Sequence, residues 1–210
     1  MSSEAAGRLL KRGERVVLAS HNKGKLVEFR ALLADSGIEI VSAAELDLPE
    51  PEETADSFEG NAAIKALAAA RATGLPALSD DSGFCVSALD GRPGIYSARW
   101  AGPGGDMQVA MQRVHDEMGD NPDRSAAFVA VLCVAWPDGT TRFAEGRCEG
   151  EVCWPPRGAQ GHGYDPVFIP DGERRSFAEL SAEEKNATSH RGRALARFLK
   201  TCVAPGDTPR

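Results

Sequence analysis

The distribution of apolar positions over the first forty residues predicts a strand, a helix and a second strand. Residues 16–19 form a short apolar run, which is typical of a buried strand. Over residues 23–34 apolar side chains return every three or four positions, as on one face of a helix, and Gly37 follows as a stop. Residues 38–41 are again mostly apolar. This order predicts an α/β protein.

The next segment predicts a second helix between an acidic loop and a third strand. The loop, residues 47–56, carries prolines and glutamates, and the helix, residues 57–73, is rich in alanine and precedes Gly74. A short strand at residues 76–79 runs into two aspartates. We expect residues 84–88 to return antiparallel to it.

The middle of the chain predicts a hairpin. Residues 126–136 form a long apolar run, residues 137–139 (Pro-Asp-Gly) have turn chemistry, and residues 140–145 alternate between polar and apolar. Further strands are predicted at residues 149–154 and 167–169. Together with the opening unit they predict a mixed sheet flanked by helices.

Two further helical regions are predicted from their capping residues. Asp106 is placed to cap a helix that extends to about Met118. Ser181 and Glu184 have the spacing of a capping box, and a last helix is predicted over about residues 187–202.

The domain organisation is simple, since the 210 residues contain no internal repeat and no long linker. We predict one α/β domain over residues 15–203, with an N-terminal extension of residues 1–14 and a polar tail of residues 204–210. No apolar run approaches the ~20 residues of a membrane helix. The start also lacks the apolar stretch and cleavage site of a signal peptide, so we expect a cytoplasmic protein without a membrane partner.

Composition excludes several kinds of protein. A net charge of −7 argues against a protein that coats nucleic acid, which usually carries a basic surplus. The five cysteines are an odd number without a Cys-x-x-Cys pair, which disfavours a disulfide framework or a zinc site. An acidic chain can still bind a small phosphorylated substrate through a few lysines and a metal ion.

The first candidate site is the turn between the first strand and the first helix. Its residues are Ser20, His21, Asn22, Lys23, Gly24 and Lys25. Amide groups at a helix start, together with lysines, can cradle a phosphate. An ordinary turn capped by Asn22 explains the same residues equally well, and the pattern of a P-loop is absent.

Carboxylates form the second and third candidates. Asp80 and Asp81 are adjacent in a strand, so one can face the core while the other binds Mg²⁺ or accepts a proton. An aspartate-rich turn is the alternative. In the acidic loop, Glu50, Glu52 and Glu53 could supply hard oxygen ligands or simply form a solvated charged segment.

The last candidates lie near the C-terminus. Residues 161–166 (Gly-His-Gly-Tyr-Asp-Pro) form a glycine-rich loop whose aromatic side chain could stack on a base. Lys185 could bind phosphates, and Arg191 could donate to a purine carbonyl. An ordinary loop and a solvated helix face are the alternatives.

Taken together and in this order, these segments resemble the inosine/xanthosine triphosphate pyrophosphatases. The resemblance covers about residues 15–200 and rests on six short stretches. They are Ser20–Lys25, Glu53-Thr54 with Asn61 and Lys65, Ser79–Gly83, Pro93–Arg99, Gly163–Phe168, and Glu184–Asn186 with Ser189–Gly192.

The resemblance implies an elongated α/β fold with a mixed central sheet, two lobes and an active-site cleft between them, usually as a homodimer. It implies Mg²⁺-dependent hydrolysis of non-canonical purine nucleoside triphosphates (ITP, dITP, XTP) to monophosphate and pyrophosphate. Asp81 matches the general base and a metal ligand, and either Glu52 or Glu53 matches a second metal ligand.

The resemblance also implies a set of substrate-binding residues. They are Ser20, His21, Asn22, Lys23, Gly24, Lys25, Lys65, Ser82, His162, Gly163, Tyr164, Asp165, Lys185, His190 and Arg191. His162 departs from the family, in which many members carry phenylalanine. A related pyrophosphatase for modified pyrimidine or methylated nucleotides, and a non-catalytic nucleotide-binding regulator, are the alternative functions.

Overall fold

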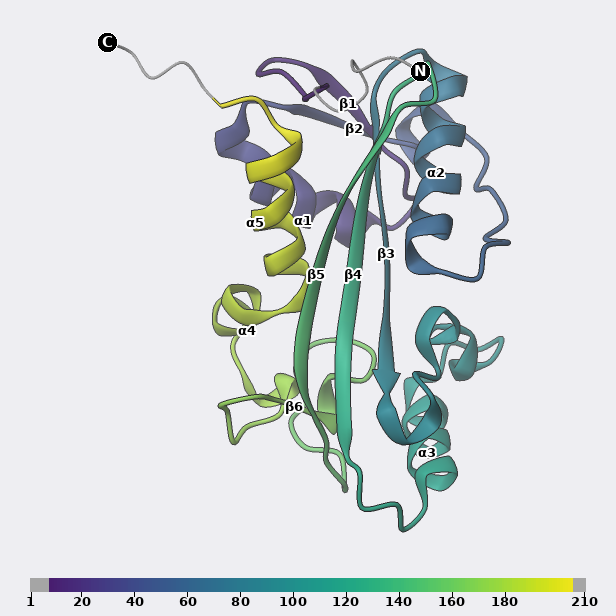
Figure 1. Cartoon of the computed structure of the whole chain (residues 1–210), viewed down its shortest axis with the longest axis vertical. Helices are drawn as coiled ribbons and strands as arrows, with labels where there is room; N and C mark the ends of the chain where they lie inside the picture. The colour runs from purple at the N-terminus through teal and green to yellow at the C-terminus, as the bar shows by residue number, and fades with distance from the viewer. Residues whose placement is uncertain (1–7, 206–210) are drawn as a thin grey trace. The chain divides into compact units, whose positions relative to one another are not determined.

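A six-stranded mixed sheet organises the computed structural model, which describes residues 8–205 (Figure 1). The strands are β1 (Arg15–Leu18), β2 (Glu39–Ser42), β3 (Ala77–Val86), β4 (Ser125–Ala135), β5 (Thr141–Val152) and β6 (Phe168–Pro170). Their order across the sheet is β2-β1-β3-β4-β5-β6. β1 pairs parallel with β2 and β3, whereas β5 and β6 pair antiparallel. The predicted mixed sheet is therefore confirmed.

Two compact units make up the chain. The first comprises Met1–Asp81, Val131–Glu145 and Ala194–Arg210, and the second comprises Ser82–Ala130 and Gly146–Arg193. β3, β4 and β5 contribute residues to both. The predicted cleft between two lobes stays a prediction.

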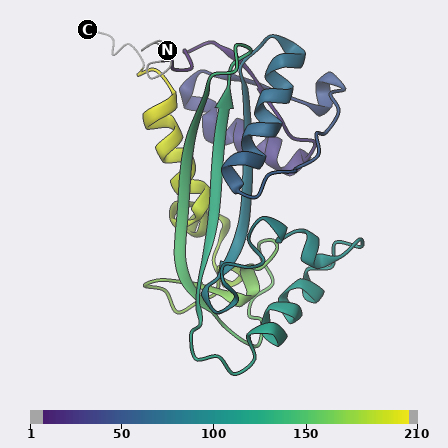
Figure 2. The ribbon, with the colours of Figure 1, turned by 45° about the vertical axis from the view of Figure 1, so that its right-hand side comes forward.

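In the first unit, two helical crossovers follow from the sequence. α1 (Lys23–Leu33) joins β1 to β2, and α2 (Phe58–Thr73) joins β2 to β3. The crossovers run in opposite directions along the sheet, so right-handed connections place α1 and α2 on opposite faces. α2 covers one face and α5 (His190–Cys202) the other (Figures 1 and 2). The buried face of α2 is mostly alanine, which lets the helix lie close to the strands.

The described ends of the chain belong to the core of this unit. Leu10 is fully buried, and its backbone N–H donates to the carbonyl of Cys202 at 2.8 Å. The N–H of Ala204 donates to the carbonyl of Leu10 at 2.7 Å. Of the predicted extension and tail, residues 8–14 and 204–205 are thus described, and the remainder lies outside the described residues.

Aromatic packing forms the core of the second unit, together with α3 (Met107–Met118). The Phe84 ring stacks on Tyr164 with centroids 4.9 Å apart and contacts Phe128 at 5.0 Å. Phe128 in turn meets the Phe168 ring edge-on at 5.0 Å. Short 3₁₀ turns link the larger elements, at Ala34–Ser36, Ala44–Leu46, Ser87–Leu89, Gly94–Tyr96, Arg99–Ala101, Asp165–Val167 and Phe177–Glu179.

Two strand predictions were wrong because neither segment shows the clear alternation of apolar and polar residues that is typical of a strand with one exposed face. β3 is one continuous strand, so the predicted return at residues 84–88 does not form. Instead, Phe84 and Val86 continue the strand into the aromatic core. β5 is likewise one strand, although two were predicted, since glycine, alanine and cysteine occupy most of its buried positions.

The last predicted helix is divided at Ser189. α4 (Ala182–Thr188) ends there and α5 begins at His190, because Ser189 has an extended backbone with φ −67° and ψ 159°. The capping box of Ser181 and Glu184 is confirmed. So is the cap of α3 by Asp106, whose side chain accepts from the Gln108 amide.

The predicted hairpin and helix stops are also confirmed. β4 and β5 are joined by a tight turn closed by a 2.9 Å hydrogen bond from the Trp136 N–H to the Thr140 carbonyl. Gly37 and Gly74 each adopt the left-handed conformation behind their helices, with φ of 70° and 69°.

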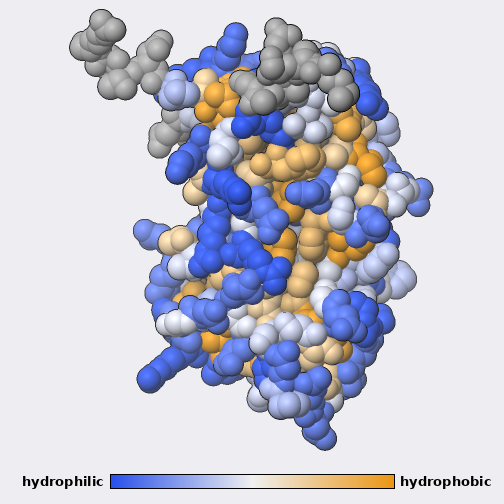
Figure 3. Space-filling model, in the orientation of Figure 1, coloured by the Kyte–Doolittle hydropathy of each residue, from blue (hydrophilic) through white to orange (hydrophobic). Residues whose placement is uncertain are grey.

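Surface and cysteine chemistry agree with the composition. Hydrophilic side chains surround scattered apolar patches on the face drawn in Figure 3. Within residues 8–205, no helix combines the length and apolar character needed to cross a membrane. All five cysteines are free thiols, and Cys133 is buried as a small apolar side chain.

A substitution at Gly150 of β5 can test how tightly the second unit is packed. A methyl group there would lie 2.1 Å from the Ile169 carbonyl oxygen and 2.7 Å from the Phe168 ring. We expect Gly150→Ala to destabilise the protein by about 1–3 kcal/mol, as overpacking typically does. Thermal unfolding should show a loss of roughly 2–12 °C.

Gly104→Ala is the matched control, because a methyl group at Gly104 meets nothing within 4 Å. Its melting temperature should stay near that of the unchanged protein. Equal losses for the two variants would contradict the packing argument.

Candidate active site

The turn between β1 and α1 is held by Asn22. Its side-chain oxygen accepts hydrogen bonds from the amides of Gly24 at 2.8 Å and Lys25 at 3.2 Å. Ser20 supports the same turn, since its hydroxyl accepts from the Asn22 amide at 3.2 Å. Asn22 is therefore the N-cap of α1, and Lys23 and Gly24 form the first helical turn.

Lys25 points from this turn to β3. Its ammonium lies 2.8 Å from a carboxylate oxygen of Asp80, and the Asp80 side chain is only 2% exposed. The sequence did not assign this role to Asp80. Its signal is the position next to Asp81 in a strand, where one of two neighbouring side chains is turned inward.

Lys65 of α2 is the centre of a second group of charges. Its ammonium lies 2.5 Å from a carboxylate oxygen of Glu53 and 3.8 Å from one of Asp81. The Lys65 side chain is 10% exposed and that of Asp81 is 12% exposed. The structure thus brings the acidic loop, α2 and β3 together at one buried ammonium.

One helical turn before Lys65, Asn61 also holds the acidic loop. Its side-chain oxygen accepts a hydrogen bond from the Ala55 amide at 3.0 Å. The spacing of four residues places Asn61 and Lys65 on the same side of α2. Glu53 is therefore fixed beside Lys65, whereas Glu52 is exposed.

Burial sets the proton affinity of these groups. It raises the pKa of Asp81 to about 6, against the lowering effect of Lys65 and with a further contribution from Glu53. Burial opposes the charged form of Lys65 too, but the hydrogen bond to Glu53 and the nearby aspartates raise its pKa overall. Asp81 is thus a carboxylate with unusual proton affinity for its type.

The same carboxylates suit Mg²⁺. Within the described part of the chain, no group of three or more His, Cys, Asp or Glu side chains is arranged to hold a metal ion. Mg²⁺, however, usually takes only one or two protein carboxylates beside waters and substrate phosphates. Glu53 and Asp81 supply two carboxylates that converge on one cation, so the donor set fits.

In the second unit, Asp165 organises the glycine-rich loop. Its Oδ2 atom accepts from the His162 amide and from the Lys185 ammonium, both at 2.5 Å. Gly161 must be glycine, because a methyl group there would lie 2.1 Å from this oxygen. His162 and Gly163 therefore follow a backbone path fixed by Asp165.

Tyr164 and His190 are packed as core residues. The Tyr164 hydroxyl donates to the Ser97 carbonyl at 2.9 Å, and burial raises its pKa above the ordinary value. The His190 ring stacks on Phe128 with centroids 4.8 Å apart. His162, by contrast, is exposed.

Arg191 and Ser82 are brought together. The Arg191 guanidinium donates to the Ser82 hydroxyl at 3.5 Å, although the two residues are 109 positions apart. Ser82 directly follows Asp81 in β3.

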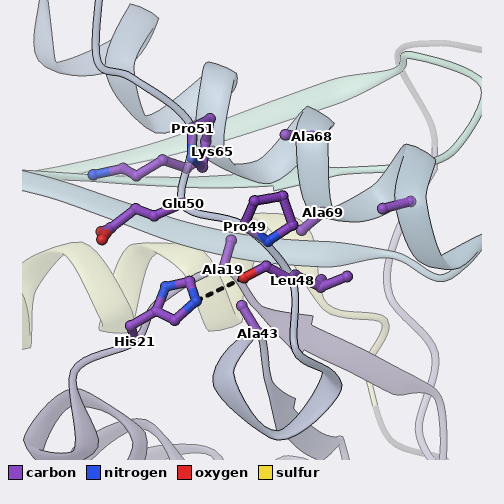
Figure 4. A pocket seen from close by; sticks show the side chains of 11 residues that line it. Ala19, His21, Ala43, Leu48, Pro49, Glu50, Pro51, Lys65, Ala68 and Ala69 are labelled. Atoms are coloured by element: carbon purple, nitrogen blue, oxygen red, sulfur yellow. Dashed lines mark hydrogen bonds between the residues drawn. The ribbon is translucent and has the colours of Figure 1, made fainter.

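Each unit also carries a pocket. In the first unit, a pocket of about 370 Å³ lies beneath the acidic loop, among residues of that loop, of α2 and of the segments that follow β1 and β2 (Figure 4). In the second unit, a more open pocket of about 710 Å³ lies between the start of α3 and the glycine-rich loop, and includes His162 and Gly163.

Comparison with known proteins gives consistent matches. The sequence pattern that defines the Ham1 family matches residues 16–201. A dITP/XTP pyrophosphatase of Gluconobacter oxydans is 72% identical over 196 residues, covering 93% of this chain and 94% of its own.

Solved structures agree with the sequence matches. A Ham1 protein of Staphylococcus aureus has a TM-score of 0.81 at 36% identity, covering 87% of this chain and 95% of its own. A HAM1 protein of Coxiella burnetii has a TM-score of 0.82 at 40% identity, with coverage of 89% and 97%.

The raised pKa of Asp81 predicts that this carboxylate destabilises the metal-free protein. A carboxyl whose pKa is higher in the folded state loses stability as pH rises from about 4 to 6, and the full cost remains above that range. We expect Asp81→Asn to raise stability near pH 7.5 by about 1–3 kcal/mol, from ~1.4 kcal/mol per pKa unit. The gain should vanish near pH 4.

Thermal unfolding in the presence of a chelator measures this gain, and Asp80→Asn is the matched control. Asp80 is paired with Lys25, so its neutralisation removes a buried ion-pair partner and should lower the melting temperature. A lower melting temperature for Asp81→Asn at neutral pH would show that its charge is stabilising instead.

Proposed function

The chain belongs to the Ham1 family, and we propose that it hydrolyses non-canonical purine nucleoside triphosphates (ITP, dITP, XTP) to the monophosphate and pyrophosphate. The observation that carries the proposal is the convergence of Glu53 and Asp81 on Lys65. It combines metal-binding oxygens, a carboxylate of raised pKa and a cation, which phosphoryl chemistry needs in one place. The name of the Gluconobacter oxydans relative, dITP/XTP pyrophosphatase, supports the substrate class.

Mg²⁺ is the proposed metal, and Glu53 and Asp81 are the residues that would hold it. When bound, it would neutralise charge on the phosphate oxygens and so favour attack by water. Glu53 is preferred to Glu52 as the ligand from the acidic loop, because Glu53 lies against Lys65 and Glu52 is exposed.

In the proposed reaction, a water oxygen attacks the α-phosphorus and forms the new P–O bond. Asp81 accepts the proton of this water and so acts as the general base. The bond from the α-phosphorus to the bridging oxygen breaks, and pyrophosphate leaves with the electron pair. Lys25 and Lys65 supply positive charge for the phosphates.

Residues of the second unit are proposed to read the base. Arg191 can only donate hydrogen bonds, so it suits the O6 carbonyl of hypoxanthine or xanthine and mismatches the 6-amino group of adenine. His190 is fixed by its stack on Phe128, which fixes the start of α5 and hence the backbone of Arg191.

The remaining expectations are part of the same proposal. They are a cytoplasmic location and a homodimer, and the homodimer is what the resemblance implies. The net charge of −7 supports a small nucleotide rather than nucleic acid as the partner.

The reaction is tested by incubating the protein with ITP, dITP, XTP, GTP and ATP in the presence of Mg²⁺. We expect monophosphate and pyrophosphate from the first three, separated by chromatography, and no turnover after chelation. Release of orthophosphate and a diphosphate would contradict attack at the α-phosphorus. Turnover confined to modified pyrimidine or methylated nucleotides would favour that alternative.

Asp81→Asn provides the catalytic control for this experiment. It should lose roughly 10²-fold or more in kcat, as expected for loss of a general base. Because the same change is expected to stabilise the metal-free protein, unfolding would not account for the loss. If Asp81→Asn kept nearly full turnover, Asp81 would not be the general base.

Base discrimination tests Arg191. An unpaired buried donor costs ~1–3 kcal/mol, so Arg191→Ala should reduce the ITP-to-ATP ratio of kcat/KM by about 5- to 150-fold. The ITP-to-GTP ratio should change less, since guanine also carries O6.

Arg193→Ala is the control, because its guanidinium donates to the Arg147 carbonyl at 2.8 Å and has no proposed contact with the base. The ITP-to-ATP ratio of this variant should match that of the unchanged protein. If Arg191→Ala also left this ratio unchanged, Arg191 would belong to phosphate binding or structure.

A further inference from the structure

The acidic loop must be held by side chains from other elements. Pro49 and Pro51 have no backbone N–H, so this stretch of chain offers fewer donors for pairing with a neighbouring strand. At its far end the loop is fixed to α2 by Asn61, and in its middle by Lys65 through Glu53. Neither contact holds the near end of the loop, around Leu48.

The near end is attached by His21. Its Nε2 atom lies 2.7 Å from the Leu48 carbonyl oxygen, and the close-up shows the ring directed at this oxygen among the residues that line the pocket (Figure 4). A carbonyl oxygen only accepts, so Nε2 must carry the hydrogen. The Leu48 amide also donates to the Ala43 carbonyl at 3.0 Å, so Leu48 is held on both sides.

The pocket explains why this contact matters. Small side chains line the pocket opposite the loop, namely Ala19, which follows β1, and Ala68, Ala69 and Ala72 of α2. A pocket rather than filled core therefore lies beneath the near end of the loop. The hydrogen bond from His21 to Leu48 therefore helps to hold this end of the loop in place.

We propose that His21 is a positioning residue, which holds the acidic loop so that Glu53 stays beside Asp81 for metal binding. The role rests on the proposed function, and it differs from the direct substrate contact that the resemblance implies for this turn. His21 reaches the metal ligands only through the loop. It also links the turn that carries Asn22 and Lys25 to the loop that carries Glu53.

Two variants separate positioning from general stability. His21→Leu keeps an apolar side chain of similar bulk but removes the donor, whereas His21→Gln places an amide N–H near the position of Nε2. One hydrogen bond shifts an equilibrium by roughly 2- to 12-fold. We expect His21→Leu to weaken binding of Mn²⁺ alone, measured by electron paramagnetic resonance, by about that factor.

Hydrogen–deuterium exchange of the metal-free protein gives a second readout. Peptides covering residues 47–57 should exchange faster by a similar factor in His21→Leu, and His21→Gln should restore both exchange and Mn²⁺ binding. At saturating Mg²⁺, the KM for ITP should stay unchanged in both variants.

Wild-type Mn²⁺ binding and loop exchange in His21→Leu would overturn the proposal. A raised KM for ITP with unchanged Mn²⁺ binding would instead assign His21 to direct substrate contact. Since neither the exchange nor the Mn²⁺ measurement uses a nucleotide, failure of the proposed reaction would appear separately, as absent turnover in the unchanged protein.

Discussion

The burial of the Lys65 ammonium beside Glu53 and Asp81 is the constraint on which the site depends. An ammonium that is 10% exposed needs carboxylate partners, because an unpaired charge is costly to remove from water. Those partners come from a loop and a strand that are distant in sequence. The ion pair with Glu53 therefore fixes the acidic loop against α2, and Asp81 of β3 supplies the second carboxylate. These two carboxylates form the proposed metal site.

The burial of Asp81 lowers the stability of the metal-free protein, and it also sets this carboxylate apart as the proposed general base. The Lys65 ammonium lies 3.8 Å from the Asp81 carboxylate but only 2.5 Å from that of Glu53. Burial then outweighs the attraction of Lys65 and leaves a raised pKa. A buried carboxylate with a purely structural role is expected to form a close ion pair, as Asp80 does with Lys25. The contrast between the two adjacent aspartates is what indicates chemistry at Asp81.

How far the sequence could predict this structure depended on whether local signals were present. Caps at Asp106 and Ser181 and the stops at Gly37 and Gly74 determined helix ends correctly, because capping chemistry is local. The unbroken course of β3 and β5 was not predicted, because β3 is buried on both faces and small residues occupy most buried positions of β5. Similarly, the sequence placed Asn22 and Lys65 in the candidate site but not the contact of His21 with Leu48. Side chains that bond to a remote backbone carbonyl leave no spacing pattern to detect.

A common arrangement joins three of the four lysines that the resemblance assigns to the substrate. Lys25 is paired with Asp80, Lys65 with Glu53, and Lys185 with Asp165, in each case within one unit. Each ammonium is thus held in one position before any ligand binds, so less side-chain freedom remains to be lost on binding. At these three positions a triphosphate meets paired rather than open cations, and must share them with carboxylates. In a chain of net charge −7, a bound divalent cation is then the simplest means of offsetting the remaining repulsion. The proposed dependence on Mg²⁺ therefore follows from how the lysines are held as much as from the oxygens that would bind the metal.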